Sequence, residues 1–134
     1  MERRGRLKLL LDTHALIWFL AGDGRLPART RTEIEAAGRE AIVSAVSAME
    51  VVTKHRLGKL PEADLLARRF EMSIEEHGFS GLPISLAHAE LAGRLDISHK
   101  DPFDRLLIAQ SLIEKLPLVS NETIFDAAGV SRIW

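Results

Sequence analysis

The stretch LKLLLDTHALIWFLA, residues 7–21, decides the fold of this protein. Its first five residues, 7–11, are almost continuously apolar, which is typical of a parallel strand covered on both faces. Asp12 follows directly, and the pattern then becomes helical through Leu20. A buried strand, an acid and a helix in this order indicate the beginning of an α/β domain.

The rest of the chain repeats this alternation of short apolar segments and helices. Extended segments are predicted at 41–44, 79–84, 118–120 and 130–134, and helices at 27–38, 45–57, 64–77, 85–95, 101–116 and, shorter, up to 128. The helix over 101–116 has the clearest start, because Asp101 takes the N-cap and Pro102 the first helical position. With 134 residues and no linker or repeat, the chain is predicted to be a single domain, 1–134, with a mainly parallel central sheet.

Composition excludes several classes of site. The chain has no cysteine, so disulfides, thiolate metal sites and a cysteine nucleophile are excluded. Its net charge of −1 means that any attraction for nucleic acid must come from a local basic patch. The longest uncharged apolar run, 15–21, is too short for a bilayer, which needs about 20 residues. The basic beginning of the chain is not followed by a signal-peptide cleavage site, so we expect a cytoplasmic protein without a membrane anchor.

Acidic residues follow several of the predicted strands. Asp12 follows the first strand, Glu50 lies in the helix after the second, and Glu122 lies just beyond the strand at 118–120. Asp101 and Asp104 begin a later helix. Ligand sites of open α/β sheets lie beyond the carboxyl ends of the strands, so folding would bring these acids together.

Carboxylates that are gathered in one cleft repel one another unless a cation or protons compensate their charge. Mg²⁺ and Mn²⁺ prefer oxygen ligands, and such an ion can activate a water and position the oxygens of a phosphoryl displacement. The residue pattern is therefore compatible with a metal site that acts on a phosphodiester.

Each acid also has a purely structural explanation. Four can be helix caps or turn residues: Asp12, Asp101, Asp104 and Glu122. Glu50 can pair with Lys54 one turn later on a solvated helix face. Apolar residues surround Glu50, however, and a buried charge needs a partner. The pattern alone leaves both explanations open.

Four blocks of the sequence resemble the motifs of the PIN-domain nucleases. The blocks are 9–18, 44–51, 99–110 and 118–122, the last continuing to 134, and they occur in the order of the family. The most specific string is Asp-Pro-Phe-Asp-Arg at 101–105. The resemblance implies a PIN-like three-layer α/β/α fold around a central, mainly parallel sheet.

Within this family the sequence resembles the VapC-type toxins of bacterial toxin–antitoxin modules. The resemblance implies an endoribonuclease that acts on single-stranded or looped RNA and uses Mg²⁺, with Mn²⁺ as a possible substitute. It also implies a homodimer and inhibition by a cognate VapB-type antitoxin, whose tail enters the active-site groove.

The resemblance also assigns roles to individual acids. Asp12, Glu50 and Asp104 match the core metal-site acids, and Asp101 is the additional acid of the Asp-Pro-Phe-Asp form; all four are predicted to be catalytic. Glu122 is predicted as a fifth metal ligand, although the family often has the shorter aspartate there.

Basic residues near these acids are predicted to hold the RNA backbone: Lys54, Arg56, Lys100 and Arg105. The alternative for each is a solvated charge on a helix surface. His14 is expected to be a packed residue and not a ligand, and Trp18 and Trp134 are expected to pack in the core or in a dimer interface.

Two other functions compete with the nuclease. A non-catalytic PIN-like module that binds RNA or protein would have lost its metal site, but every acidic position is present. A phosphatase or phosphate-handling switch on a similar sheet would have a second aspartate two residues after Asp12, where this chain has His14.

Overall fold

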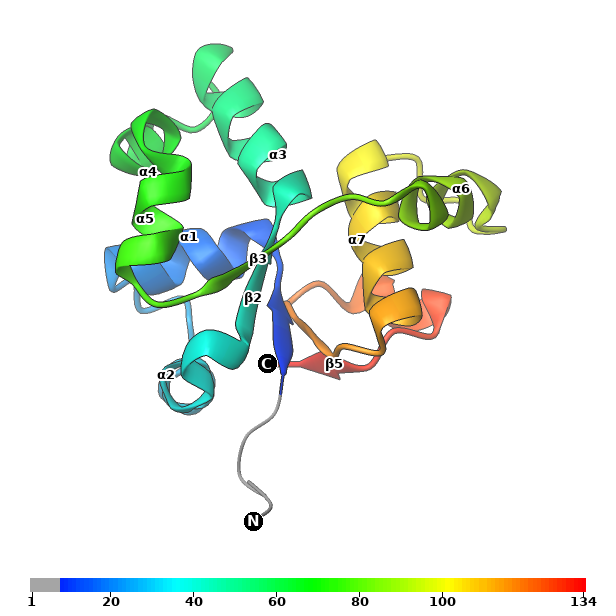
Figure 1. Cartoon of the computed structure of the whole chain (residues 1–134), viewed down its shortest axis with the longest axis horizontal. Helices are drawn as coiled ribbons and strands as arrows, with labels where there is room; N and C mark the ends of the chain where they lie inside the picture. The colour runs from blue at the N-terminus through cyan, green and yellow to red at the C-terminus, as the bar shows by residue number, and fades with distance from the viewer. Residues whose placement is uncertain (1–7) are drawn as a thin grey trace.

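A five-stranded sheet forms the centre of the computed structural model, which describes residues 8–134 (Figure 1). Its strands are β1 (Leu9–Leu11), β2 (Ala41–Ser44), β3 (Ser80–Leu82), β4 (Leu118–Val119) and β5 (Arg132–Ile133), in the order β3-β2-β1-β4-β5. Every neighbouring pair of these strands is parallel, which confirms the predicted parallel sheet. The predicted start of the first strand at Leu7 and the basic beginning of the chain lie outside the described residues.

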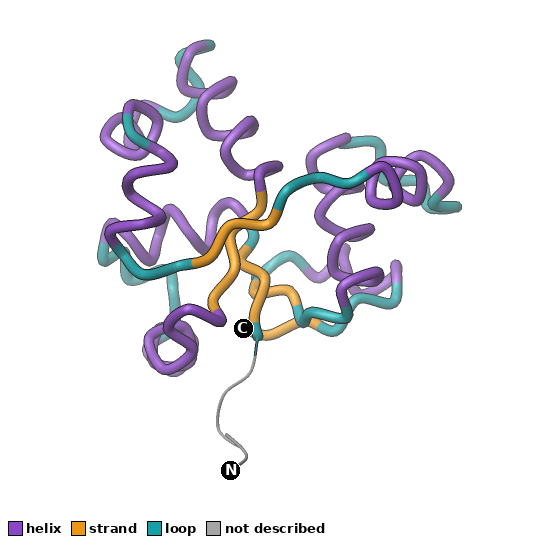
Figure 2. Tube along the Cα trace, viewed as in Figure 1, coloured by secondary structure: helices purple, strands orange, loops and turns teal. Residues whose placement is uncertain are grey.

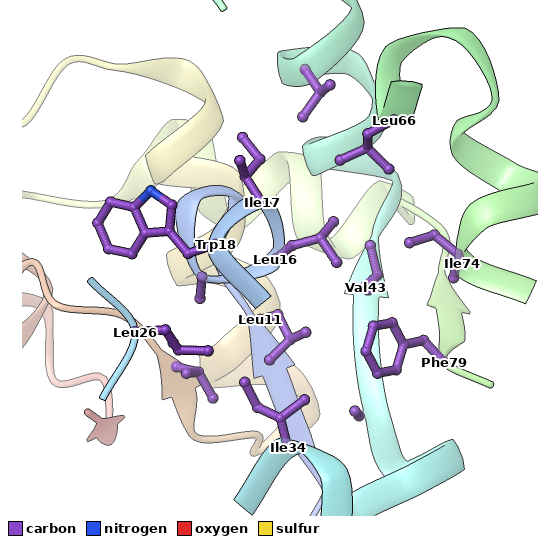
Figure 3. Close-up of a cluster of buried hydrophobic side chains, with 14 of the residues drawn as sticks. Leu11, Leu16, Ile17, Trp18, Leu26, Ile34, Val43, Leu66, Ile74 and Phe79 are labelled. Carbon is purple, nitrogen blue, oxygen red and sulfur yellow. The ribbon is translucent and has the colours of Figure 1, made fainter. Parts of the chain in front are cut away.

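Strand β1 is apolar at each position because both of its faces are buried. Leu9 and Leu11 belong to one hydrophobic cluster, whereas Leu10, on the opposite face, belongs to another. Figure 3 shows the first cluster, in which Leu11 packs among Leu16 and Val43. The prediction that this apolar strand is covered on both faces is therefore confirmed.

Helices cover both faces of the sheet, and the predicted three-layer α/β/α arrangement is confirmed (Figures 1 and 2). One face carries α1 (Thr13–Ala21), α2 (Ala28–Ala37), α4 (Asp64–Arg68) and α5 (Phe70–Glu76), and the other carries α6 (Leu86–Arg94) and α7 (Pro102–Glu114). Helix α3 (Ala45–Arg56) continues from β2 and contributes Val46 to one cluster and Val51 to the other.

The prediction of a single helix over 64–77 is wrong. The chain forms α4 and α5 instead, and Arg69 between them has the non-helical angles φ −143° and ψ 51°. Helix α4 packs against α3 whereas α5 packs against β3, and one straight helix could not make both contacts. No glycine or proline near Arg69 marks this break, so tertiary packing alone decides it.

The other elements agree with the prediction to within a few residues. The predicted short helix before residue 128 is a 3₁₀ helix, Thr123–Ala128, and shorter 3₁₀ turns lie at Gly38–Glu40 and Pro61–Ala63. The strands predicted at 118–120 and 130–134 are each two residues long. Within residues 8–134, each helix is too short or too polar to cross a membrane.

The strand order reverses beside β1. The chain runs from β1 through β2 to β3 on one side, and then returns to place β4 and β5 on the other side. Open parallel sheets bind ligands beyond the carboxyl ends of the two strands at such a reversal, here β1 and β4. Asp12 follows β1 and Ser120 follows β4, so both lie at this point.

Candidate active site

A small pocket of about 80 Å³ lies beyond the carboxyl ends of β1 and β4. Its wall contains all five acids that were predicted as metal ligands: Asp12, Glu50, Asp101, Asp104 and Glu122. The remaining lining residues are Thr13, His14, Lys54 and Leu107. Folding therefore brings together acids from four separate segments of the chain.

Asp12 is both a helix cap and a member of this pocket. Its Oδ1 accepts a hydrogen bond of 2.7 Å from the backbone N–H of Ala15, which caps α1. Burial raises the pKa of Asp12 to about 6; hydrogen bonds from Ser120 and Ala15 oppose this, and the charge of Glu122 adds to it. The predicted cap is therefore confirmed, and the same side chain also lies in the wall of the pocket.

Glu50 is buried, with 5% of its surface exposed, and both of its carboxylate oxygens have partners. Oε1 accepts a hydrogen bond of 2.6 Å from the hydroxyl of Thr13, and Oε2 accepts one of 2.5 Å from Nζ of Lys54. The Thr13 hydroxyl also lies 3.0 Å from that of Ser47. Because Thr13 has a single hydroxyl proton and gives it to Glu50, Ser47 is the donor to Thr13.

Thr13 and Ser47 are site residues that the sequence analysis missed. Two signals could have found them: Thr13 adjoins Asp12, and Ser47 precedes Glu50 by three residues on the same helix face. Together they fix the buried carboxylate of Glu50 relative to α1.

Asp101 is the N-cap of α7, as predicted. Its Oδ1 accepts from the backbone N–H of Phe103 at 2.8 Å and of Asp104 at 3.3 Å. This cap places the side chains of Asp101 and Asp104 at the start of α7, where that helix meets the pocket.

Asp104 is held by a histidine that the sequence analysis did not single out. Nε2 of His99 lies 2.6 Å from Oδ2 of Asp104. Burial raises the pKa of Asp104, the hydrogen bond from His99 lowers it, and the charges of Asp101, Glu122 and Glu50 raise it further. The acids are therefore close enough to influence one another electrostatically.

The donor set of the pocket fits a hard divalent cation. It consists of carboxylate oxygens, and the pKa values of Asp12 and Asp104 are raised first by burial and further by the charges of neighbouring acids. Within residues 8–134, no three acidic or histidine side chains already converge as a ligand set. Glu50 is held by Lys54 and Asp104 by His99, so a bound cation would share these carboxylates with their present partners or displace those partners.

The four basic residues predicted to hold RNA have different environments. Lys54 lines the pocket, whereas Arg56 and Lys100 are exposed and lie outside its wall. The structure contradicts the prediction for Arg105, which donates hydrogen bonds of 2.6–3.4 Å to carbonyl oxygens of Ala92, Gly93, Leu95, Ile97 and His99. All five N–H groups of its guanidinium are used, so Arg105 holds the segment between α6 and α7 and has none left for a phosphate.

The aromatic residues beside the pocket pack as expected. The His14 ring lies 5.7 Å from the Trp18 ring and also contributes to the pocket wall. Trp18 is buried, and it contacts Trp134 edge to face at 5.9 Å. Both tryptophans therefore belong to the packed interior beside β5.

Comparisons with known proteins agree with this fold. The PIN domain family matches residues 9–130. A toxin-antitoxin complex from Klebsiella pneumoniae contains a chain that is similar with a TM-score of 0.65 and 20% identity, over 94% of this chain and 96% of that one. DNA-bound VapBC from Salmonella typhimurium contains another, with a TM-score of 0.69 and 18% identity, over 95% of this chain and 97% of that one.

No curated protein is similar enough to this chain to count as a match. The family match nevertheless spans nearly the whole described chain and includes all five acids of the pocket. This chain belongs to the PIN domain family.

Proposed function

We propose that this protein is a metal-dependent endoribonuclease and the VapC-type toxin of a toxin–antitoxin module. Mg²⁺ is the proposed cofactor, with Mn²⁺ as a possible substitute. The observation that carries the proposal is the gathering of five carboxylates in one pocket at the reversal of a parallel sheet. Similarity to chains of two toxin–antitoxin complexes supports the assignment to a toxin.

The proposed roles of the residues follow from their contacts. Asp12, Glu50, Asp101, Asp104 and Glu122 would hold the ion, which when bound lowers the pKa of a water and neutralises charge on the phosphate. The N-cap bond of Asp12 and the Thr13 bond of Glu50 limit the movement of two of these carboxylates. Limited movement favours catalysis because the carboxylates need little reorganisation when substrate binds.

The proposal is tested with labelled RNA that contains single-stranded and looped segments. Cleavage is expected with Mg²⁺ and not with EDTA, and it should leave a 5′-phosphate and a 3′-hydroxyl, because an activated water attacks. Products with a 2′,3′-cyclic phosphate would contradict this mechanism, since they report attack by the ribose hydroxyl. Binding without cleavage would favour the non-catalytic module, and hydrolysis of monoesters alone would favour the phosphatase.

The proposed path of the RNA backbone includes Lys54, Arg56 and Lys100. Affinity for single-stranded RNA is expected to fall with salt with a slope of roughly −0.7 per phosphate contact, so replacing Lys54 and Arg56 by glutamine should remove about 1.4 from that slope. The measurement uses Ca²⁺ in place of Mg²⁺, so that RNA binds without being cut. Arg105→Lys is the control: it should lower stability and leave the slope unchanged, and an unchanged slope in the double variant would remove Lys54 and Arg56 from the path.

We also propose a protein antitoxin of the VapB type as partner, and the cytoplasm, where RNA is available, as the site of action. Two similar chains come from toxin–antitoxin complexes, which supports this partnership. Expression of this chain alone is expected to arrest growth, and co-expression of its antitoxin to relieve the arrest.

A homodimer is the remaining proposal, and an apolar groove of about 680 Å³ between α3, α5 and β3 supports it. Ala48, Ile74 and Phe79 line this groove, and Met49 and Val52, also on α3, are 63% and 44% exposed. Large exposed apolar patches mark interaction surfaces, and light scattering of the purified protein measures whether a second copy covers this one.

A further inference from the structure

Lys54 is the only lysine or arginine among the described residues that line the acidic pocket. Its Nζ lies 2.5 Å from Oε2 of Glu50, one helical turn earlier on α3. We propose that Lys54 is an internal counter-ion that holds Glu50 while the pocket lacks a divalent ion and competes with that ion for the carboxylate. This inference rests on the proposed function, because it concerns regulation of the same metal site.

The contacts of Glu50 place the ammonium of Lys54 at the carboxylate that the ion would bind. One oxygen accepts the Thr13 hydroxyl and the other accepts Lys54, and the side chain is almost fully buried. Thr13 is itself fixed by Ser47, so the Lys54 contact is the one that can open by movement of a partly exposed side chain. An ion that binds Oε2 therefore meets the ammonium at the same oxygen, and the two cations share it or one displaces the other.

The charge of Lys54 opposes the ion as well. A lysine side chain is an ammonium at neutral pH, and that of Lys54 forms an ion pair with Glu50 in the wall of the pocket. A positive charge in the pocket weakens the binding of a divalent cation by Coulomb repulsion in addition to direct competition.

The side chain of Lys54 has room to move away from Glu50. The Lys54 side chain is 30% exposed, and its Nζ lies 5.9 Å from the centre of the Phe103 ring. Its flexible stem of four carbons lets the ammonium turn toward the opening of the pocket. There it would meet the phosphate of an incoming RNA, so that entry of the ion converts a counter-ion of Glu50 into a contact for the substrate.

The test is titration of the full-length protein with Mn²⁺ alone, with free Mn²⁺ counted by electron paramagnetic resonance. Lys54→Met is expected to bind Mn²⁺ roughly tenfold or more tightly than wild type, because it removes both the competitor and its charge. Lys59→Met is the matched control: it removes an exposed lysine just beyond α3 and should change the affinity by less than about twofold.

A double-mutant cycle separates competition for Glu50 from a general effect of charge. In a Glu50→Gln background, Lys54→Met should change Mn²⁺ affinity much less than in wild type, because the carboxylate for which Mn²⁺ and the Lys54 ammonium compete is gone. A full effect in that background would overturn the proposal.

A measurement on wild type guards against a Lys54→Met protein that does not fold. The Nζ signal of Lys54 in ¹⁵N-labelled wild-type protein is expected to change from a protected to a solvent-exchanging ammonium as Mg²⁺ is added. A signal that Mg²⁺ leaves unaltered, or a Lys54→Met affinity for Mn²⁺ that is equal to or weaker than that of wild type, would overturn the proposal.

The outcomes also distinguish this inference from the proposed function. If wild type binds Mn²⁺ and Lys54→Met binds it equally, competition by Lys54 is refuted and the metal site stands. If neither protein binds Mn²⁺, both the inference and the metal-dependent function fail.

Discussion

Asp12→Asn is expected to reduce RNA cleavage by roughly a hundredfold or more while leaving the metal-free protein more stable than wild type at pH 7. Asparagine can keep the cap on α1, because its side-chain oxygen can still accept the N–H of Ala15. It removes a carboxylate whose ionised form is disfavoured by burial. Loss of activity and gain of stability therefore have a single cause.

The direction of the stability change follows from the pKa. The folded protein holds the proton of Asp12 up to about pH 6, whereas the ordinary pKa is 3.8. Between these values the folded state binds more protons than the unfolded state, so wild type loses stability as the pH rises through this window. Above this window the folded state holds the ionised carboxylate at its full free-energy cost, and the asparagine variant should be more stable by about 3 kcal/mol.

Urea unfolding of both proteins in EDTA, at pH 4 and at pH 7, measures this difference. The advantage of Asp12→Asn should be present at pH 7 and nearly absent at pH 4, where wild type is protonated in the folded state. An asparagine variant that is less stable by the same amount at both values would show that Asp12 is only a helix cap.

Asp104→Asn is expected to lose most of the stability that Mg²⁺ gives to wild type. A ligand that binds only the folded state adds about 2.7 kcal/mol when its concentration reaches a hundred times the dissociation constant. Asp104 lies among the charges of Asp101, Glu122 and Glu50, so its neutralisation relieves repulsion in the metal-free protein. The metal-free variant should therefore melt no lower than wild type, while Mg²⁺ raises its melting temperature little.

Asp101→Ser is the control for this experiment. Serine can still cap α7 and accept the N–H of Phe103, but it has no charge. We expect this variant to fold normally and to cut RNA more slowly than wild type. An Asp104→Asn protein that is destabilised without metal, yet is stabilised by Mg²⁺ and remains active, would refute the placement of Asp104 in a metal site.

The sequence by itself determined the architecture and the membership of the pocket. The apolar run at 9–11 could only be satisfied between two layers of helices, because each of its side chains needs an apolar partner on its own face. The placement of acids after successive strands predicted their convergence, since parallel strands share one carboxyl edge. The caps at Asp12 and Asp101 could also be predicted from the sequence, because a cap depends on residues within one helical turn.

Only the tertiary structure decided which partners the polar side chains take. Arg105 was predicted to contact RNA because it adjoins the acids, but the end of α6 and the segment that follows it present five carbonyl groups to its guanidinium. The break at Arg69 likewise depends on packing against α3 and β3, which lie elsewhere in the sequence.

The partners of the pocket acids were likewise decided by the tertiary structure. Thr13 and Glu50 are 37 residues apart, and their hydrogen bond exists only because α1 and α3 begin at neighbouring strands. Local sequence fixes the direction in which a helix or strand presents a side chain, but the atom that this side chain meets is set by elements that fold against it from a distance. The spacing of residues therefore predicted which acids share a pocket, and the tertiary contacts decided that Lys54 and His99 hold two of them.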